Sequence, residues 1–193
     1  MPTLHVCPLS RLNDTVEETG ASHIVTLISA NTVVERPVCI AADRHLFISV
    51  SDICEPAEGM ILPSDTHVEQ LLAFVHGWDR RAPMVIHCFA GISRSTAAAF
   101  IAACALEPRQ EETAIAKRLR AASATATPNS RLISVADQLL CREGRMVAAI
   151  TAIGRGAFAT EGRPFELRLH DQARDLGPRT RRRPVPKGWR RSA

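Results

Sequence analysis

One segment limits the fold of this 193-residue chain more than any other: His87–Ser95, with the sequence HCFAGISRS. The run Met84-Val85-Ile86 before it is short and apolar, which is typical of a buried strand. The run RSTAAAFIAACAL, which begins at Arg94, is rich in alanine and other small residues, which favours a closely packed helix. The order is therefore strand, glycine-containing loop and helix, with Cys88 at the end of the strand.

This position gives Cys88 a distinctive electrostatic environment. A helix N-terminus presents unpaired backbone N–H groups and the positive end of the helix dipole, so it stabilises a thiolate and would also stabilise a bound phosphate. Gly91 permits the loop to turn its amides inward. The guanidinium of Arg94 can hold two phosphate oxygens at once, and the hydroxyl of Ser95 can hydrogen-bond the sulfur when it acts as a leaving group.

The same residues match HCxxGxxR(S/T), the signature of the cysteine-based protein tyrosine phosphatase superfamily. The chain resembles the small dual-specificity members of this superfamily, because the segments ISVSD, the helix from Ser64 and PNSRLISVADQLL also occur in that family's order. The resemblance covers about residues 20–143. It implies an α/β fold in which helices flank a central, mostly parallel sheet.

The remaining pattern alternates between the two kinds of element. We expect strands at 23–28 and 46–50, a helix of about four turns from Ser64 with Thr66 and Glu69 as a capping box, and helices at 111–122, 129–142 and 146–153. Alternating apolar and charged residues at 165–169 indicate an edge strand. The predicted organisation is a phosphatase domain at 1–158, an edge-strand extension at 159–173 and a basic, disordered tail at 174–193.

The resemblance implies a two-step reaction, in which the Cys88 thiolate attacks phosphorus and water then hydrolyses the cysteinyl-phosphate. It assigns Arg94 and Ser95 to catalysis and His87 to a supporting role. The phosphate-binding loop would consist of Phe89, Ala90, Gly91, Ile92, Ser93 and Arg94. Phe89 and Ile92 are the candidates for the pocket wall.

A general acid is also needed to protonate the leaving oxygen. Asp52 is the preferred candidate, because it directly follows a predicted strand and stands 36 residues before Cys88, where the family places this acid. Three other aspartates are weaker candidates. Asp65 suits the first turn of a helix, Asp79 a helix end in solvent, and Asp43 lies before the strand. By the same resemblance, Asn129 supports the site indirectly.

The expected substrate is a phosphoprotein or phosphopeptide. The chain contains no tyrosine, so it lacks the tyrosine-bearing loop that deepens the pocket of classical tyrosine phosphatases; a shallower pocket would accept phosphotyrosine and also phosphoserine or phosphothreonine. The loop contains no lysine, which disfavours inositol lipids. Two alternatives stay open: an RNA 5′-triphosphatase of the same superfamily, and a catalytically silent phosphate-binding module.

Charge and composition add information about partners and location. Residues 174–193 contain eight arginines and lysines against one aspartate, a net charge of +7 in a chain whose total is +4. This tail could contact an acidic protein, a nucleic acid or anionic lipid, or act only as a solvated tail. The sequence shows neither a membrane span nor a secretory signal, which favours a cytoplasmic location, and it indicates no metal or organic cofactor. Cys54 and Cys104 are more simply packing residues than redox partners of Cys88.

Overall fold

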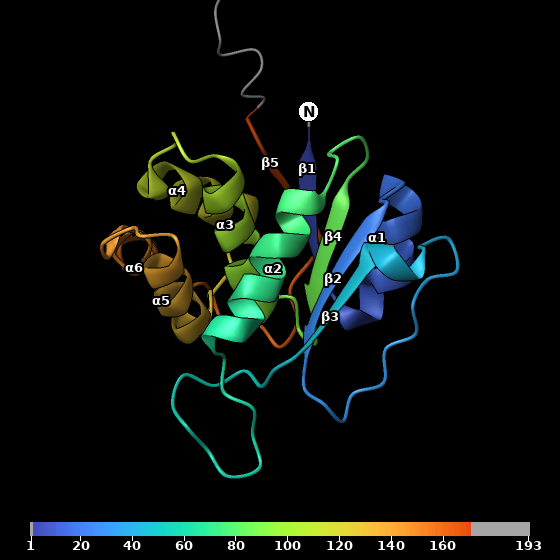
Figure 1. The fold of residues 1–193 in the computed structure, drawn as a ribbon, viewed down its shortest axis with the longest axis horizontal. Coiled ribbons are helices and arrows are strands. Elements are labelled where there is room, and N and C mark those ends of the chain that lie inside the picture. The colour runs from blue at the N-terminus through green and yellow to red at the C-terminus, as the bar shows by residue number, and fades with distance from the viewer. Residues whose placement is uncertain (1, 171–193) are drawn as a thin grey trace, which may run out of the picture.

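Short runs rich in Val, Ile and Leu form a five-stranded sheet in the computed structural model, which describes residues 2–170 (Figure 1). The strands, in the spatial order β3-β2-β4-β1-β5, have these bounds: β1 Thr3–Pro8, β2 His23–Ile28, β3 His45–Ser49, β4 Met84–Cys88 and β5 Phe165–Arg168. The first four are parallel to one another, and β5 pairs antiparallel with β1. The predicted fold class, a mostly parallel sheet flanked by helices, is confirmed.

Helices cover both faces of this sheet unequally. Only α1 (Leu12–Thr19) packs on one face, and the other carries α2 (Asp65–Gly77), α3 (Arg94–Leu106), α4 (Glu112–Ala122), α5 (Ser130–Leu139) and α6 (Arg145–Ile153) (Figure 1). Two short 3₁₀ helices, Leu9–Arg11 and Ala42–Arg44, precede α1 and β3. All 13 residues of α3 are buried, because this helix lies between the sheet and α2, α4 and α5.

The predicted elements agree with the structure within a few residues, with three exceptions. The first strand and the first helix were not expected. The capping box expected at Thr66 and Glu69 is wrong: Ser64 precedes the helix, and its backbone N–H donates to the His67 ring at 3.1 Å. The helix therefore begins two positions earlier than that pair requires. The edge strand at 165–169 is present as β5.

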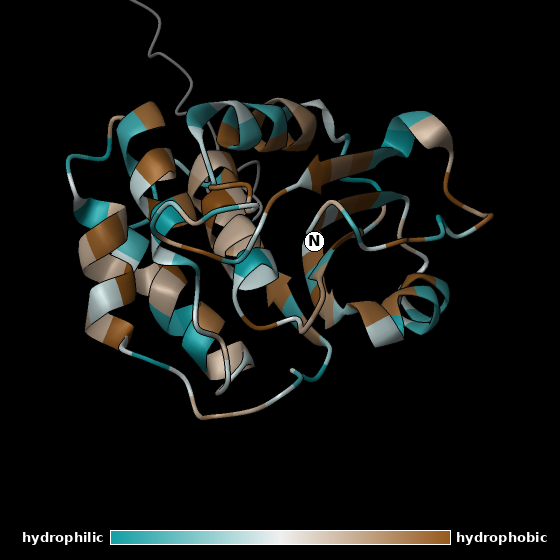
Figure 2. Cartoon of the chain, turned by 90° about the horizontal axis from the view of Figure 1, so that it is seen from below, coloured by the Kyte–Doolittle hydropathy of each residue, from teal (hydrophilic) through white to brown (hydrophobic). Residues whose placement is uncertain are grey.

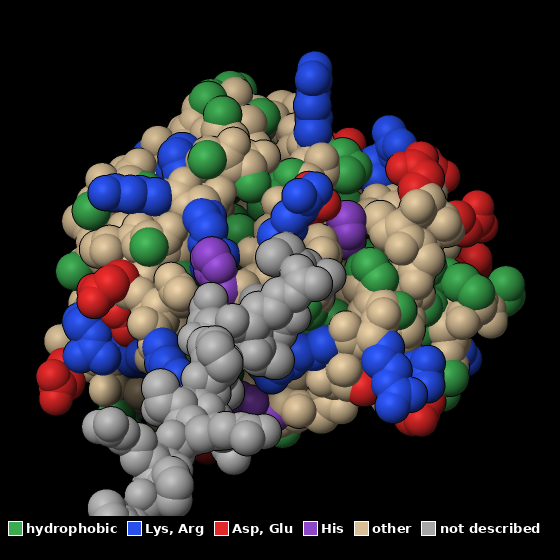
Figure 3. Space-filling model, turned by 90° about the horizontal axis from the view of Figure 1, so that it is seen from above, with side chains coloured by type: hydrophobic (Ala, Val, Ile, Leu, Met, Phe, Trp, Pro, Cys, Tyr) green, Lys and Arg blue, Asp and Glu red, His purple; other side chains and the backbone are tan. Residues whose placement is uncertain are grey.

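The hydrophobic core has a major and a minor part. The major part fills the space between the sheet and α2–α6 and includes Phe100, Ile86 and Trp78, whereas the minor part lies under α1. Figure 2 views the molecule from the carboxyl ends of the parallel strands, and the apolar strand residues lie between layers whose outer surfaces are more polar. In the opposite view, Figure 3, basic and acidic side chains both occur around the edge.

No helix within residues 2–170 is long and apolar enough to cross a membrane. The predicted basic tail at 174–193 lies outside the described residues. The domain boundaries predicted at 158 and 173 stay predictions.

Candidate active site

The loop between β4 and α3 is held from outside through its backbone carbonyls. Leu9 N–H donates to the carbonyl oxygen of Phe89 at 3.1 Å, and Gly162 N–H donates to that of Ala90 at 2.8 Å. On the other side, Thr127 N–H donates to the carbonyl oxygen of Ile92 at 2.9 Å. Because these carbonyls face away from the loop's concave side, the loop N–H groups are free to face into it, as an anion-binding cradle requires.

Gly91 is required at its position for two independent reasons. Its φ of +70° lies in the left-handed region, where side chains are strained. A Cβ on Gly91 would also lie 2.7 Å from the backbone nitrogen of Pro8 and 2.9 Å from the carbonyl carbon of Cys7. The loop therefore packs directly against the end of β1, the strand that the sequence did not reveal.

Cys88 is buried at the bottom of this loop with two polar contacts on its sulfur. Gly91 N–H donates to Sγ at 3.3 Å, and Ser95 Oγ lies 3.1 Å from it. Ser95 is the second residue of α3, so its contact depends on the helix beginning at Arg94. The arrangement stabilises negative charge on the sulfur through a backbone amide, a hydroxyl and a helix N-terminus.

Arg94 is almost fully buried and joins this loop to the residues that follow β2 and β3. Its Nη1 donates to the carbonyl oxygen of Val50 at 2.8 Å and lies 3.4 Å from Ser29 Oγ. Its Nε is buried without a hydrogen-bond partner among the described residues. A buried guanidinium nitrogen is costly to leave unpaired, so this donor is suited to an anion that enters the cradle.

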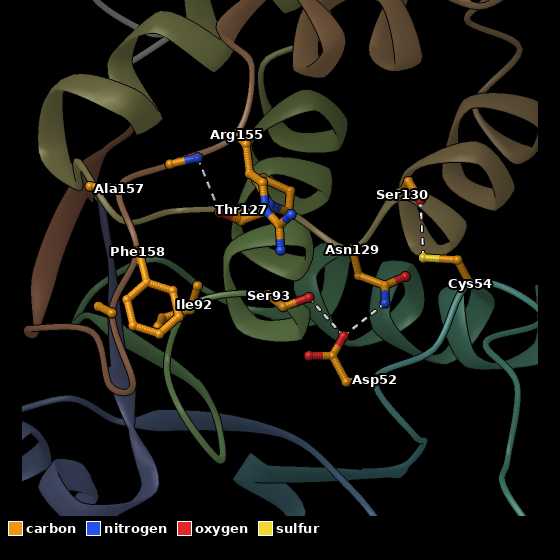
Figure 4. A pocket seen from close by; sticks show the side chains of 13 residues that line it. Asp52, Cys54, Ile92, Ser93, Thr127, Asn129, Ser130, Arg155, Ala157 and Phe158 are labelled. Carbon is orange, nitrogen blue, oxygen red and sulfur yellow. Dashed lines mark hydrogen bonds between the residues drawn. The ribbon is translucent and has the colours of Figure 1, made fainter.

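Asp52 lies at the mouth of the loop. Its Oδ1 accepts hydrogen bonds from Ser93 Oγ at 2.7 Å and from Asn129 Nδ2 at 2.8 Å, as Figure 4 shows. Asn129 also donates to the carbonyl oxygen of Ile53 at 3.3 Å and caps α5. Both donors bind the same oxygen, and Oδ2 has no partner among the described residues, so it is available to exchange a proton with a substrate.

The other aspartates lie in different settings. Asp43 precedes β3 and Asp79 precedes β4, so both lie toward the amino ends of strands, and Cys88 is at the carboxyl end. Asp65 occupies the first turn of α2, where it complements the helix dipole. Only Asp52, of these four, is hydrogen-bonded to a residue of the loop. This geometry supports Asp52 as the acid.

His87 is buried behind the loop in a chain of three polar side chains. Its Nε2 lies 2.6 Å from Thr26 Oγ1, which in turn lies 2.7 Å from His45 Nε2. Burial lowers the pKa of His87 to about 4, against a smaller opposing contribution from the Cys88 backbone. The ring is therefore neutral near pH 7, which suits support of the loop better than proton transfer to the substrate.

A cavity of about 740 Å³ adjoins the loop (Figure 4). Asp52, Ile92 and Ser93 line one part of it, while Phe89 is exposed and lies outside the lining. Residues 155–159 line another part, and sequence reasoning missed them. The only available signal was the pair of glycines at 154 and 156, because this segment is held through its own backbone groups rather than through its side chains.

The two other cysteines considered are placed differently. Cys104 lies ten residues along α3 from Arg94, a rise of about 15 Å, which is too far for a disulfide with Cys88. Burial raises the pKa of the Cys104 thiol. Cys54 is exposed, with its sulfur 3.1 Å from Ser130 Oγ, so the expectation that it packs in the interior is wrong.

Comparison with known proteins agrees with this fold. Residues 58–139 match the family model for protein-tyrosine phosphatase, a range that includes the loop and begins after Asp52. No curated protein matches the chain. Among solved structures, DUSP15 is 18% identical with a TM-score of 0.58, and the alignment covers 79% of this chain and 91% of that one.

Two human structures are similar to a comparable degree. The tyrosine phosphatase-like serine/threonine/tyrosine-interacting protein is 17% identical over 74% of this chain and 94% of that one, with a TM-score of 0.58. DUSP28 is 17% identical over 74% of this chain and 96% of that one, with a TM-score of 0.55. The predicted resemblance is confirmed as a resemblance: part of the chain matches the protein-tyrosine phosphatase model, and the fold is similar to those of DUSP15 and DUSP28.

Proposed function

We propose that this protein is a cysteine-dependent phosphatase that hydrolyses phosphotyrosine, and also phosphoserine or phosphothreonine, in protein substrates. One observation carries the proposal: Cys88 Sγ lies 3.3 Å from the Gly91 N–H and 3.1 Å from Ser95 Oγ, in a loop whose Arg94 Nε is buried and unpaired among the described residues. These groups together provide a nucleophile and a cradle for the phosphate that it attacks.

In the first step the Cys88 thiolate attacks phosphorus, and the bond between phosphorus and the leaving oxygen breaks. Asp52 donates a proton to that oxygen, and the loop amides with Arg94 stabilise the charge on the phosphoryl oxygens. In the second step the Asp52 carboxylate takes a proton from water as the water attacks phosphorus. The departing Cys88 sulfur then accepts a hydrogen bond from Ser95, which stabilises the thiolate.

The first test is hydrolysis of an activated aryl phosphate, with Cys88→Ser as the comparison and vanadate as inhibitor. We expect vanadate-sensitive turnover in the intact protein, none in Cys88→Ser, and loss of both turnover and vanadate binding in Arg94→Ala. A folded protein that binds phosphate without turnover would support the phosphate-binding module instead. A preference for triphosphorylated RNA over a phosphotyrosyl peptide would support the RNA 5′-triphosphatase. The cytoplasmic location also stays a prediction.

A further inference from the structure

We propose that the cavity beside the phosphate-binding loop is a second substrate subsite, in which Arg155 binds an anionic group that the phosphorylated substrate carries near its scissile phosphate. The inference rests on the proposed phosphatase function and specifies its substrate class. The cavity of about 740 Å³ is continuous with Ile92, Ser93 and Asp52, so a substrate seated in the loop passes directly alongside it.

Among the described residues, Arg155 is the only basic one that lines this cavity. Its guanidinium forms no ion pair or hydrogen bond with any described residue. Asp52 is the only carboxylate in the lining, and its Oδ1 is already bound by Ser93 and Asn129. In Figure 4 the Arg155 side chain points into the cavity, between Thr127 and Ser93. The cavity therefore contains an unpaired cation with donors free for a ligand.

The backbone on either side of Arg155 is held in place. Arg120 Nη2 donates to the carbonyl oxygen of Gly154 at 2.8 Å, and Ala157 N–H donates to that of Ala124 at 2.9 Å. A Cβ on Gly156 would lie 2.6 Å from the backbone of Thr125, so this close approach requires glycine. These contacts fix the position of the Arg155 Cα atom, whereas the Cα atom of an arginine in an unrestrained loop can move.

The segment that holds Arg155 also holds the phosphate-binding loop. Thr127 Oγ1 accepts a hydrogen bond from Gly156 N–H at 3.1 Å, and Thr127 N–H donates to the carbonyl oxygen of Ile92 at 2.9 Å. One residue thus connects the base of Arg155 to the cradle. A fixed separation between two anion-binding groups selects substrates that carry two anions at a matching distance.

The occupant indicated by charge complementarity is a carboxylate or a second phosphate on the same phosphopeptide. A guanidinium can bind either anion through two parallel hydrogen bonds. The ring of Phe158 is 96% exposed at the edge of the same cavity and offers an apolar contact for the peptide chain. A large apolar side chain exposed beside a cation suits the binding of an extended peptide better than that of a free small anion.

The test compares three phosphotyrosyl peptides that differ at neighbouring positions: neutral, acidic, or carrying a second phosphate. Each is assayed with the intact protein, with Arg155→Gln, and with the control Arg109→Gln, which removes the same charge beyond the far end of α3. For Arg155→Gln we expect KM to rise about fivefold for the anionic peptides, with kcat unchanged and no change for the neutral peptide. Arg109→Gln should leave all three unchanged, and Arg155→Lys should restore part of the loss. Whichever of the acidic and the doubly phosphorylated peptides shows the larger rise in KM for Arg155→Gln carries the anion that Arg155 binds more tightly.

A KM that Arg155→Gln leaves unchanged for both anionic peptides, or raises equally for all three peptides, would overturn the subsite. Hydrolysis of a small activated aryl phosphate separates this result from failure of the proposed function, because that substrate does not reach the cavity. If the intact protein hydrolyses it while the peptide pattern is absent, only the subsite is wrong. If the intact protein hydrolyses no substrate, both proposals are wrong.

Discussion

At the scale of single residues, the two oxygens of Asp52 have different environments. Oδ1 accepts two hydrogen bonds, which Asn at this position could still accept, and Oδ2 is the atom that would carry the proton. We expect Asp52→Asn to lower kcat/KM about 100-fold or more for alkyl phosphates, whose leaving oxygens need protonation. For an activated aryl phosphate the loss should stay within about tenfold.

Leaving-group dependence, measured as kcat/KM across a series of phosphate esters, checks this assignment. Asp65→Asn serves as the matched control, because it makes the same chemical change in the first turn of α2. If Asp65→Asn showed the leaving-group dependence and Asp52→Asn did not, the acid would be Asp65.

Thr26 is a second residue whose role is open to a direct test. A hydroxyl has one proton, so between His45 and His87 Thr26 donates to one ring and accepts from the other. Thr26→Val should leave the buried His87 Nε2 and the half-buried His45 Nε2 without this hydrogen-bond partner. We expect this loss to lower the free energy of unfolding by about 1–3 kcal/mol. Chemical denaturation measures this change. Thr26→Ser should retain most of the stability, and equal losses in both variants would mean that the hydroxyl contributes little.

At the scale of elements, the strand, loop and helix around Cys88 could be predicted because every signal is local. The β-branched run, the glycine and the alanine-rich helix lie consecutively in the sequence. By contrast, β1 and α1 were missed. Strand β1 contains His5, Cys7 and Pro8 within six residues, and only its position between β4 and β5 makes it a central strand.

The candidate site was predictable to the same extent. Cys88, Arg94 and Asp52 have side-chain signatures, and the structure brings them to one end of the sheet. The contacts from Leu9, Thr127 and Gly162 to the loop are made by backbone N–H groups, which any residue except proline can supply. Such contacts do not depend on residue type, so they cannot be predicted from the sequence and are seen only in the three-dimensional structure.

Helix α6 provides a prediction at this scale. It begins without a capping side chain of its own, and Asp137 of α5 supplies the acceptors instead. Its Oδ2 accepts from Met146 N–H at 2.7 Å, and its Oδ1 accepts from Gly144 N–H at 2.6 Å. We expect Asp137→Ala to lower the free energy of unfolding by about 2 kcal/mol, since it leaves the buried Met146 N–H and the partly buried Gly144 N–H without this acceptor. Urea denaturation measures the loss, and Ser134→Ala is a control on the same helix. Equal stability of the Asp137 variant and the intact protein would contradict this role.

At the scale of the whole molecule, buried histidines make stability depend on pH. Burial lowers the pKa of His87 to about 4. Desolvation also lowers the pKa of His45, and the positive charge of Arg36 lowers it further. A lowered pKa in the folded state means that the unfolded chain binds protons first as the pH falls. The stabilisation is therefore complete above about pH 6.5 and is lost progressively toward pH 4.

From His87 alone, we expect a loss of about 2 kcal/mol between pH 7 and pH 5, or about 4–8 °C in Tm. Thermal unfolding followed at several pH values in this range measures it, above the pH at which most carboxylates titrate. His45→Gln keeps a hydrogen-bonding group at position 45 but removes a titrating ring. The fall in Tm between pH 7 and pH 5 should therefore be smaller in this variant than in the intact protein. A Tm that stayed constant or rose from pH 7 to pH 5 would contradict the expectation.

The link between Gly162 and the loop also has a consequence for the order in which this protein is made. Synthesis proceeds from the N-terminus, so the ribosome releases Cys88, Arg94 and Asp52 long before Gly162 and β5. Until those later residues emerge, the carbonyl of Ala90 has no partner from Gly162 and β1 is an open edge of the sheet. If the proposed function is correct, a nascent chain carries Cys88 before the cradle is fully assembled, and full activity requires that Gly162 and β5 have emerged.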